Sequence, residues 1–207
     1  SKDGNEIEIV NPSTNTVIDT VPAAAAADVD EALQAAKTAK KSWARTPVWK
    51  RSEILVRFAN IVRENTKELA QLLSRESGKP IAHAKTLYGM NIPLDSQQGI
   101  ENDVYLTRRE PLGVIVGIIP FNFPVDIFSH KVAPALSAGN VAIVKPPEDD
   151  PLTVLKLVEY LYEAGLPENV LQVVTGKGNV GQQLVESPIV DGISFTGSTE
   201  TGIKVAT

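Results

Sequence analysis

The chain has 207 residues, of which 43% are apolar and 22% charged, with a formal net charge of −5 at pH 7. These values are typical of a soluble globular protein with a substantial core, and the acidic balance argues against a nucleic-acid partner. No apolar run approaches the roughly 20 residues that span a bilayer, and the first residues show no signal-peptide core, so we expect a cytoplasmic protein that needs no membrane. The sequence has no cysteine and two histidines, His83 and His130. These counts exclude disulfides and a cysteine nucleophile within these residues, and they predict no metal site.

Residues 1–102 predict a mainly helical N-terminal segment. Two short strand-like runs, Ile7–Val10 and Val17–Val21, come first and flank a turn. Three helices should follow, the third ending at Gly78. Their expected start signals are, in chain order, a capping box of Asp28 and Glu31, Thr46-Pro47, and Asn65 with Glu68.

Residues 103–112 predict an extra strand outside the main sheet, because Asp103–Arg109 alternate apolar and polar side chains and the alternation stops before Pro111. This strand could pair with another subunit and so produce a homo-oligomer. It could equally fold back as an edge strand on its own chain. Both alternatives remain open at the level of the sequence.

Residues 113–207 contain four short apolar runs, each followed by a turn and a helical pattern. Apolar runs without polar alternation indicate strands that are buried on both faces, as in a parallel sheet covered by helices. The fold prediction is therefore α/β, with an open parallel sheet flanked by helices. We expect Gly139 and Gly165 to end two of these helices, and Asp150-Pro151 to begin one. The four runs are Val114–Ile119, Val141–Val144, Val170–Val174 and Gly192–Phe195.

Polar residues and glycines gather where the four runs end. In open parallel sheets, ligands bind outside the carboxyl ends of the strands. The function is therefore expected at this edge. The segments expected to line it are Pro120–Pro124, Lys145–Glu148, Thr175–Gly178 and Thr196–Thr199.

The turn Gly176–Gly181 matches the dinucleotide fingerprint G-x-G-x-x-G, which is weak evidence by itself. The acidic partner expected about 20 residues later could only be Glu200. The same spacing could belong to the P-loop of a nucleoside triphosphatase, but that motif is excluded because Gln182-Gln183 stands where Lys-Ser/Thr is required. A second turn, Phe195–Gly202, begins a helix whose free N–H groups favour an anion. The alternative is that these glycines merely allow tight strand-to-helix connections.

Taken together, the motifs resemble the aldehyde dehydrogenase family. The resemblance covers nearly the whole chain, and the motifs stand in the expected order. The segments that carry it are Ile9–Pro12, Glu76–Pro80, Pro120–Pro124, Ala135–Asn140 with Lys145–Glu148, Gly165–Pro167 and Phe195–Gly202.

The family oxidises aldehydes with NAD or NADP through a cysteine thiohemiacetal and a thioester. The resemblance therefore implies a Rossmann-like sheet, a small-molecule aldehyde as substrate and a homo-oligomeric parent protein. It also implies that the Asn122 amide donates to the oxyanion of the adduct. Considered without the family, an isolated Asn near a proline is more simply a turn or cap residue.

The resemblance further implies how NAD is held. Lys145 and Glu148 would bind the adenosine ribose, although a solvated charge pair is the simpler alternative. Ser198 and the Gly197 amide would meet the pyrophosphate, and the Glu148 carboxylate favours NAD over NADP. The implied cofactor-binding residues, which include Gly178 and Gly181 as the adenine wall, are Ile119, Pro120, Phe121, Lys145, Glu148, Gly178, Gly181, Phe195, Thr196, Gly197, Ser198 and Gly202.

Three departures from the family matter. The sequence stops at Thr207 without the family's cysteine nucleophile and glutamate base, a helix expected after Ala84 is missing, and the Gly178–Gly181 turn is about one residue short. We therefore expect the N-terminal, cofactor-binding part of an NAD-linked aldehyde dehydrogenase. The alternatives are a non-catalytic dinucleotide-binding or assembly module, and a structural protein that pairs through residues 103–109.

Overall fold

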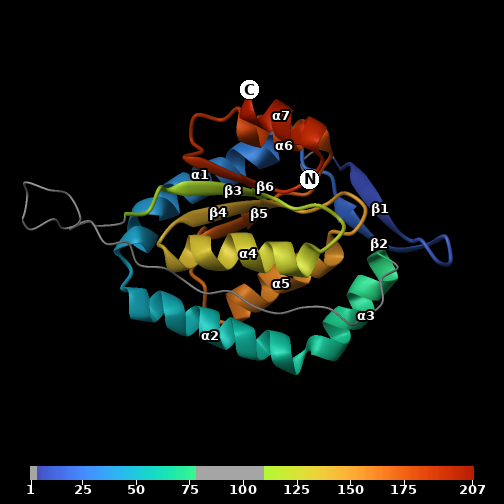
Figure 1. Cartoon of the computed structure of the whole chain (residues 1–207), viewed down its shortest axis with the longest axis horizontal. Coiled ribbons are helices and arrows are strands. Elements are labelled where there is room, and N and C mark those ends of the chain that lie inside the picture. Colours follow the sequence, from blue (N-terminus) through green and yellow to red (C-terminus); the bar gives the residue numbers. More distant parts are fainter. Residues whose placement is uncertain (1–3, 78–109) are drawn as a thin grey trace, which may run out of the picture.

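A computed structural model describes residues 4–77 and 110–207 (Figure 1). Its main sheet has the strand order β5-β4-β3-β6, and all neighbouring strands run parallel. Each strand lies within one residue of its predicted bounds at either end, so the predicted α/β fold with a parallel sheet is confirmed. The strands are β3 (Val114–Ile118), β4 (Val141–Lys145), β5 (Leu171–Val173) and β6 (Gly192–Phe195).

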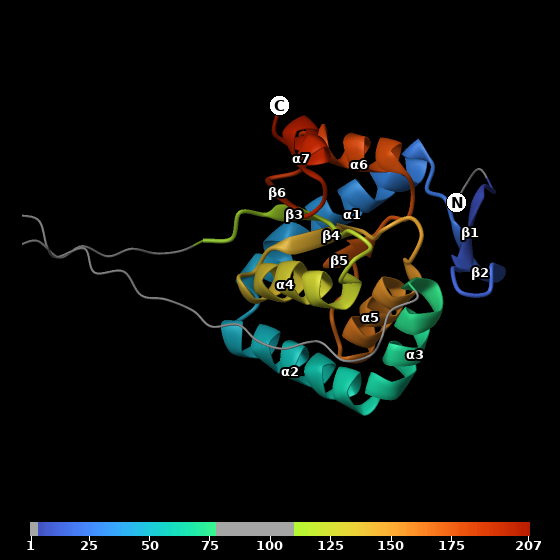
Figure 2. The same ribbon diagram turned by 45° about the vertical axis from the view of Figure 1, so that its right-hand side comes forward.

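Helices cover both faces of this sheet (Figures 1 and 2). On one face lie α1 (Ala26–Arg45) and α6 (Gly178–Val185), with α7 (Thr199–Ala206) beside them. On the other face lie α4 (Pro124–Ser137) and α5 (Leu152–Glu163). Outside these two, α2 (Val48–Glu64) and α3 (Thr66–Ser77) form a further layer. In the part of the chain that the structure describes, no helix is both long and apolar enough to cross a membrane.

A small antiparallel hairpin, β1 (Glu6–Asn11) and β2 (Thr16–Pro22), lies apart from the main sheet and contacts α3. The predicted extra strand over residues 103–112 falls mostly outside the described residues. Residues 110–112, which are described, form no strand. His83 and the predicted end of the third helix at Gly78 also lie outside the described residues.

One hydrophobic core joins the N-terminal helices to the sheet. Trp43 of α1 is almost completely buried, and its indole Nε1 donates to the Leu136 carbonyl of α4 at 3.2 Å. All five residues of β4 are buried, because helices cover both faces of this central strand. The burial explains why the strand reads as a continuous apolar run up to its last residue.

The N-cap of α1 is Ala25, three residues before the predicted Asp28. The helix begins at Ala26, so Asp28 stands inside the first turn instead of at the N-cap. Its carboxylate accepts the backbone N–H of Ala25 at 2.8 Å. The predicted helix ends at Gly139 and Gly165 are confirmed, since both residues adopt the left-handed conformation, with φ of 91° and 93°.

The start of α5 also differs from the prediction. The helix begins at Leu152 with Pro151 at the N-cap position, so the assignment of Asp150 as N-cap and Pro151 as first helical residue is wrong. The backbone N–H groups of Leu152 and Thr153 are instead bound by Glu76 of α3. The cap is supplied from a distant part of the sequence, which no local motif encodes.

Candidate functional site

The order of the strands places a topological switch point between β3 and β6. The chain passes outward from β3 through β4 to β5 and then returns to the opposite side of β3 to form β6. In open α/β sheets, ligands bind at the carboxyl ends of the strands where the order reverses in this way. The segments that follow β3 and β6, residues 119–123 and 196–198, are therefore the first candidates for a binding site.

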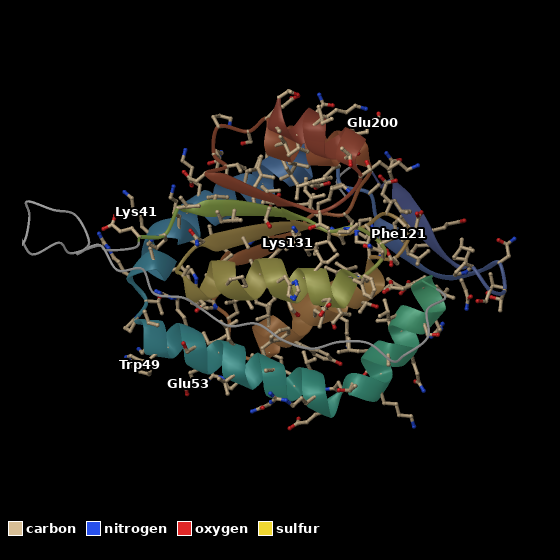
Figure 3. The ribbon with its side chains drawn as sticks, viewed as in Figure 1. Lys41, Trp49, Glu53, Phe121, Lys131 and Glu200 are labelled. Carbon is tan, nitrogen blue, oxygen red and sulfur yellow. The ribbon has the colours of Figure 1, made fainter. Side chains whose placement is uncertain are left out.

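The segment after β3 exposes its polar and aromatic groups. Asn122 is exposed, and its side-chain amide makes no hydrogen bond with the described residues. Phe121 and Phe123 on either side are 66% and 48% exposed, and Phe121 lies at the end of the sheet near the β1–β2 hairpin (Figure 3). The base of the segment is fixed, since Ile119 is buried and its N–H donates to the Lys145 carbonyl at 3.1 Å. Asn122 is thus an available donor on an anchored turn.

The end of β4 presents a buried lysine beside a half-buried glutamate. Lys145 is 7% exposed, and its Nζ donates to the Pro146 carbonyl at 3.2 Å. Burial lowers the pKa of Lys145, while the charge of Glu148 opposes this shift. A Cβ on Gly181 of α6 would lie 3.5 Å from Lys145 Cδ. The structure therefore brings three of the predicted ribose and adenine residues together.

The G-x-G-x-x-G turn does not form a dinucleotide fingerprint of the simple kind. That motif requires a strand–helix–strand unit whose second strand carries the ribose-binding acid. Here β5 and β6 lie at opposite edges of the described sheet. The nominal acid, Glu200, is exposed on α7 and pairs with Lys204 at 2.7 Å. Gly178 is exposed at the start of α6, where a Cβ would meet nothing within 4 Å.

The turn between β6 and α7 surrounds an open depression of about 530 Å³. Ser198 is the N-cap of α7, and its Oγ accepts the Thr201 N–H at 3.2 Å. Gly197 packs close to the Phe195 ring, since a Cβ at this position would lie 2.5 Å from Cζ. Gly202 approaches the same ring at 3.4 Å by the same measure. The first N–H groups of α7 that no cap satisfies remain available to an anion in this depression.

The predicted site residues thus fall into three groups at the carboxyl edge of the sheet. Lys145, Glu148, Gly178 and Gly181 lie around the ends of β4 and α6, and Phe195, Thr196, Gly197, Ser198 and Gly202 line the β6–α7 turn. Ile119, half-buried Pro120, Phe121 and Asn122 stand between β3 and α4. Within the described residues, no cluster of three or more histidine, aspartate or glutamate side chains is placed to hold a metal ion.

Sequence reasoning missed one polar contact near the switch point. Lys131 of α4 is 9% exposed, and its Nζ donates to Ser194 Oγ of β6 at 3.0 Å. Burial lowers the pKa of Lys131. The signal was present in the helical periodicity, because Lys131 lies three residues after Phe128 on the face that covers the sheet.

Comparison with known proteins shows the family to which the chain belongs. The family model described as "Aldehyde dehydrogenase family" matches residues 1–207. The chain belongs to the aldehyde dehydrogenase family. The resemblance read from the sequence motifs is therefore confirmed.

Several solved aldehyde dehydrogenase structures are similar to the chain. An aldehyde dehydrogenase from Brucella melitensis biovar abortus 2308 is 34% identical, with a TM-score of 0.84. The match covers 100% of this chain and 46% of the Brucella chain. PnpE in complex with nicotinamide adenine dinucleotide is 35% identical, with a TM-score of 0.85. The match covers 99% of this chain and 45% of PnpE. An NADP-dependent glyceraldehyde-3-phosphate dehydrogenase from Bacillus halodurans C-125, complexed with NADP, is 33% identical, with a TM-score of 0.86. The match covers 99% of this chain and 47% of the dehydrogenase. The chain spans about half the length of these relatives.

Proposed function

We propose that this chain is the cofactor-binding part of an NAD-dependent aldehyde dehydrogenase and holds the dinucleotide along the carboxyl edge of its sheet. The observation that carries the proposal is the switch point between β3 and β6, where Asn122 and the N-terminus of α7 offer available donors. Bound NAD supplies the acceptor for the hydride that leaves the aldehyde carbon. The chain's own residues bind the cofactor and orient it.

The residues at this edge fit a dinucleotide. The α7 N-terminus and Ser198 suit a pyrophosphate, because the helix presents N–H donors and a favourable dipole. Glu148 and Lys145 suit ribose hydroxyls, which need both an acceptor and a donor. The exposed Gly178 leaves open space at the start of α6, in which an adenine ring can lie.

NAD is the preferred cofactor in this proposal. The Glu148 carboxylate would repel the 2′-phosphate of NADP. The ammonium of Lys145 interacts with the Glu148 carboxylate and softens this preference without reversing it. The solved relatives include one complex with NAD and one with NADP, so the choice rests on these two residues.

Catalysis needs more than these residues. Asn122 would donate to the oxyanion that forms on the aldehyde, a contribution typically worth about 3–4 kcal/mol of barrier. The 207 residues contain no cysteine, so the nucleophile of the family reaction has to come from outside them. The same observation favours the alternative function, a dinucleotide-binding or assembly module that does not catalyse.

Calorimetric titration of the chain with NAD and with NADP tests the proposal. We expect saturable binding that is tighter for NAD, and a smaller difference between the two cofactors in Glu148→Gln. Ser198→Glu should repel the pyrophosphate and Gly178→Leu should block the adenine. Lys204→Gln is the matched control, because it changes an exposed charge of α7 away from the depression. Equal affinity of all variants for NAD would refute the assignment of the site.

A further inference from the structure

Glu76 is a buried carboxylate in the last turn of α3 that contacts a different element of the protein. It is 3% exposed. Its Oε2 accepts the Leu152 N–H at 2.7 Å and its Oε1 accepts the Thr153 N–H at 2.9 Å. The Thr153 hydroxyl also donates to Oε1. One carboxylate therefore holds two of the first N–H groups of α5, although it lies 76 residues before them.

The segment held in this way leads directly to the proposed ribose site. Residues 146–151 connect β4 to α5 and contain Glu148. Only Asp149, Asp150 and Pro151 separate Glu148 from α5. Asp150 is 1% exposed and Pro151 has a fixed φ, so this short stretch can absorb little movement within itself. The first end of the segment is fixed by β4 and its second end by the contact with Glu76. A shift at the start of α5 is therefore passed on to Glu148.

Glu76 also borders the segment that carries Asn122. A cavity of about 420 Å³ is lined by Glu76, by Asp149 next to Glu148, and by Phe121 next to Asn122. Burial raises the pKa of Glu76, and the hydrogen bonds from Thr153 and Leu152 partly oppose this shift. The charged form is thus costly at this position, while a glutamine could satisfy only part of the donor set.

We propose that Glu76 is a positioning residue for the cofactor site: its carboxylate fixes the start of α5 and thereby places Glu148 against the ribose. The proposal rests on the proposed function, because it assumes that Glu148 binds the dinucleotide. It adds a residue on α3 that touches no cofactor and still determines affinity. A purely structural cap would stabilise α5 without affecting how Glu148 contributes to binding.

A double-mutant cycle separates these two roles. The affinity of NAD is measured by calorimetry for the wild-type chain, Glu76→Gln, Glu148→Gln and the double variant, and thermal unfolding is followed for each. Glu68→Gln is the control. Glu68 lies on the same helix and also contacts α5, with its carboxylate 3.8 Å from Lys156 Nζ, but it is remote from residues 146–151.

We expect Glu76→Gln to weaken NAD binding about tenfold, because Glu148 would lose its hydrogen bond to the ribose. A tenfold loss is typical of one hydrogen bond to a charged group. In the Glu148→Gln background the same change should alter the affinity less than about twofold, and Glu68→Gln should bind as the wild type does. Should Glu76→Gln fail to unfold cooperatively, the cycle is repeated with Thr153→Val, which removes one donor and keeps the shape of the side chain.

Two results would overturn the positioning role alone. One is that Glu76→Gln, or Thr153→Val in its place, binds NAD as tightly as the wild type. The other is that this change lowers NAD affinity equally in the wild-type and Glu148→Gln backgrounds. Failure of the wild-type chain to bind NAD or NADP would instead refute the proposed function, and the positioning role with it. The two failures are therefore distinguishable in the same set of titrations.

Discussion

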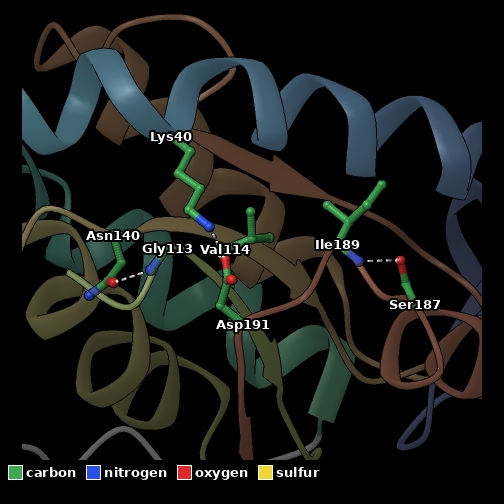
Figure 4. Close-up of polar contacts among 7 residues, drawn as sticks. All are labelled: Lys40, Gly113, Val114, Asn140, Ser187, Ile189 and Asp191. Atoms are coloured by element: carbon green, nitrogen blue, oxygen red, sulfur yellow. Dashed lines mark hydrogen bonds and ion pairs between the residues drawn. The ribbon is translucent and has the colours of Figure 1, made fainter.

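Replacement of Asp191 should destabilise the fold at neutral pH without affecting the cofactor edge. Asp191 lies just before β6, at the amino edge of the sheet (Figure 4). Its Oδ2 accepts the Lys40 ammonium of α1 at 2.6 Å and the Val114 N–H of β3 at 2.7 Å. One carboxylate thus joins a helix, the first residue of β3 and the entry to β6. Asparagine can keep the bond from Val114 but loses the ion pair.

The expected loss follows from these contacts. A hydrogen bond to a charged group contributes about 1.5–3 kcal/mol, and an exposed ion pair at most about 1 kcal/mol. The side chains of Lys40 and Asp191 are 37% and 33% exposed, so the lower part of this range applies. We expect Asp191→Asn to lower the free energy of unfolding by about 1–2 kcal/mol. For a chain of this length that corresponds to a shift of about 3–6 °C in Tm.

Denaturant unfolding from pH 7 to pH 3 tests this expectation. Burial raises the pKa of Asp191, but the hydrogen bonds from Lys40 and Val114 and the charge of Lys40 outweigh it, so the pKa lies below 3.8. A depressed carboxyl pKa stabilises the fold above the unfolded pKa, and the stabilisation is lost as the pH falls through the folded pKa. The difference between wild type and Asp191→Asn should therefore begin to shrink near pH 4. A difference that stays constant to pH 3, or one no larger than that of the exposed Glu200→Gln control, would refute the reasoning.

Two further variants probe the carboxyl edge and its support. Gly197→Ala should weaken NAD binding without unfolding the chain. Its Cβ would lie 2.5 Å from Phe195 Cζ and would therefore move the ring that lines the depression. Unchanged NAD affinity by calorimetry would contradict this. Lys131→Met should leave stability at pH 7 within about 1 kcal/mol of wild type, since it removes a buried ammonium together with its bond to Ser194. Because burial lowers the pKa of Lys131, the wild-type chain should also gain stability as the pH rises through the folded pKa toward 10.5, and thermal scans of Lys131→Met should lack this gain.

The strands could be predicted from the sequence because burial on both faces leaves a direct trace in it. β4 reads as an unbroken apolar run, and its helical cover makes any polar residue there costly until Lys145. The helix ends at Gly139 and Gly165 were also predictable, since each needs a left-handed conformation that glycine adopts without strain. These are local constraints, and local patterns encode them.

The starts of α1 and α5 were predicted less well, because several residues can satisfy the same N–H groups, whereas α3 begins directly after Asn65 as predicted. Asp28 acts from inside the first turn of α1, although aspartate is equally common at the N-cap. The cap of α5 comes from Glu76, which is distant in sequence, and its existence depends on how α3 packs against α5. The burial of Lys131 could be read from the helical periodicity of α4, but its partner Ser194 could not, because the contact depends on how α4 packs against the sheet. Side chains that meet only through the tertiary fold leave no spacing in the sequence from which they could be read.

The two edges of the sheet divide stability from binding. At the amino edge the polar groups are engaged with the protein itself: Asn140 Oδ1 accepts the Gly113 N–H at 2.9 Å, and Asp191 binds Val114 and Lys40. At the carboxyl edge, the amide of Asn122 and the first N–H groups of α7 are left available to a ligand. These donors face solvent, so a ligand can bind them without breaking a hydrogen bond within the protein, which is why we propose the cofactor site at this edge. Asp191→Asn should therefore lower the free energy of unfolding at constant NAD affinity. Gly178→Leu should lower NAD affinity at constant stability, because a Cβ at this exposed position meets nothing within 4 Å.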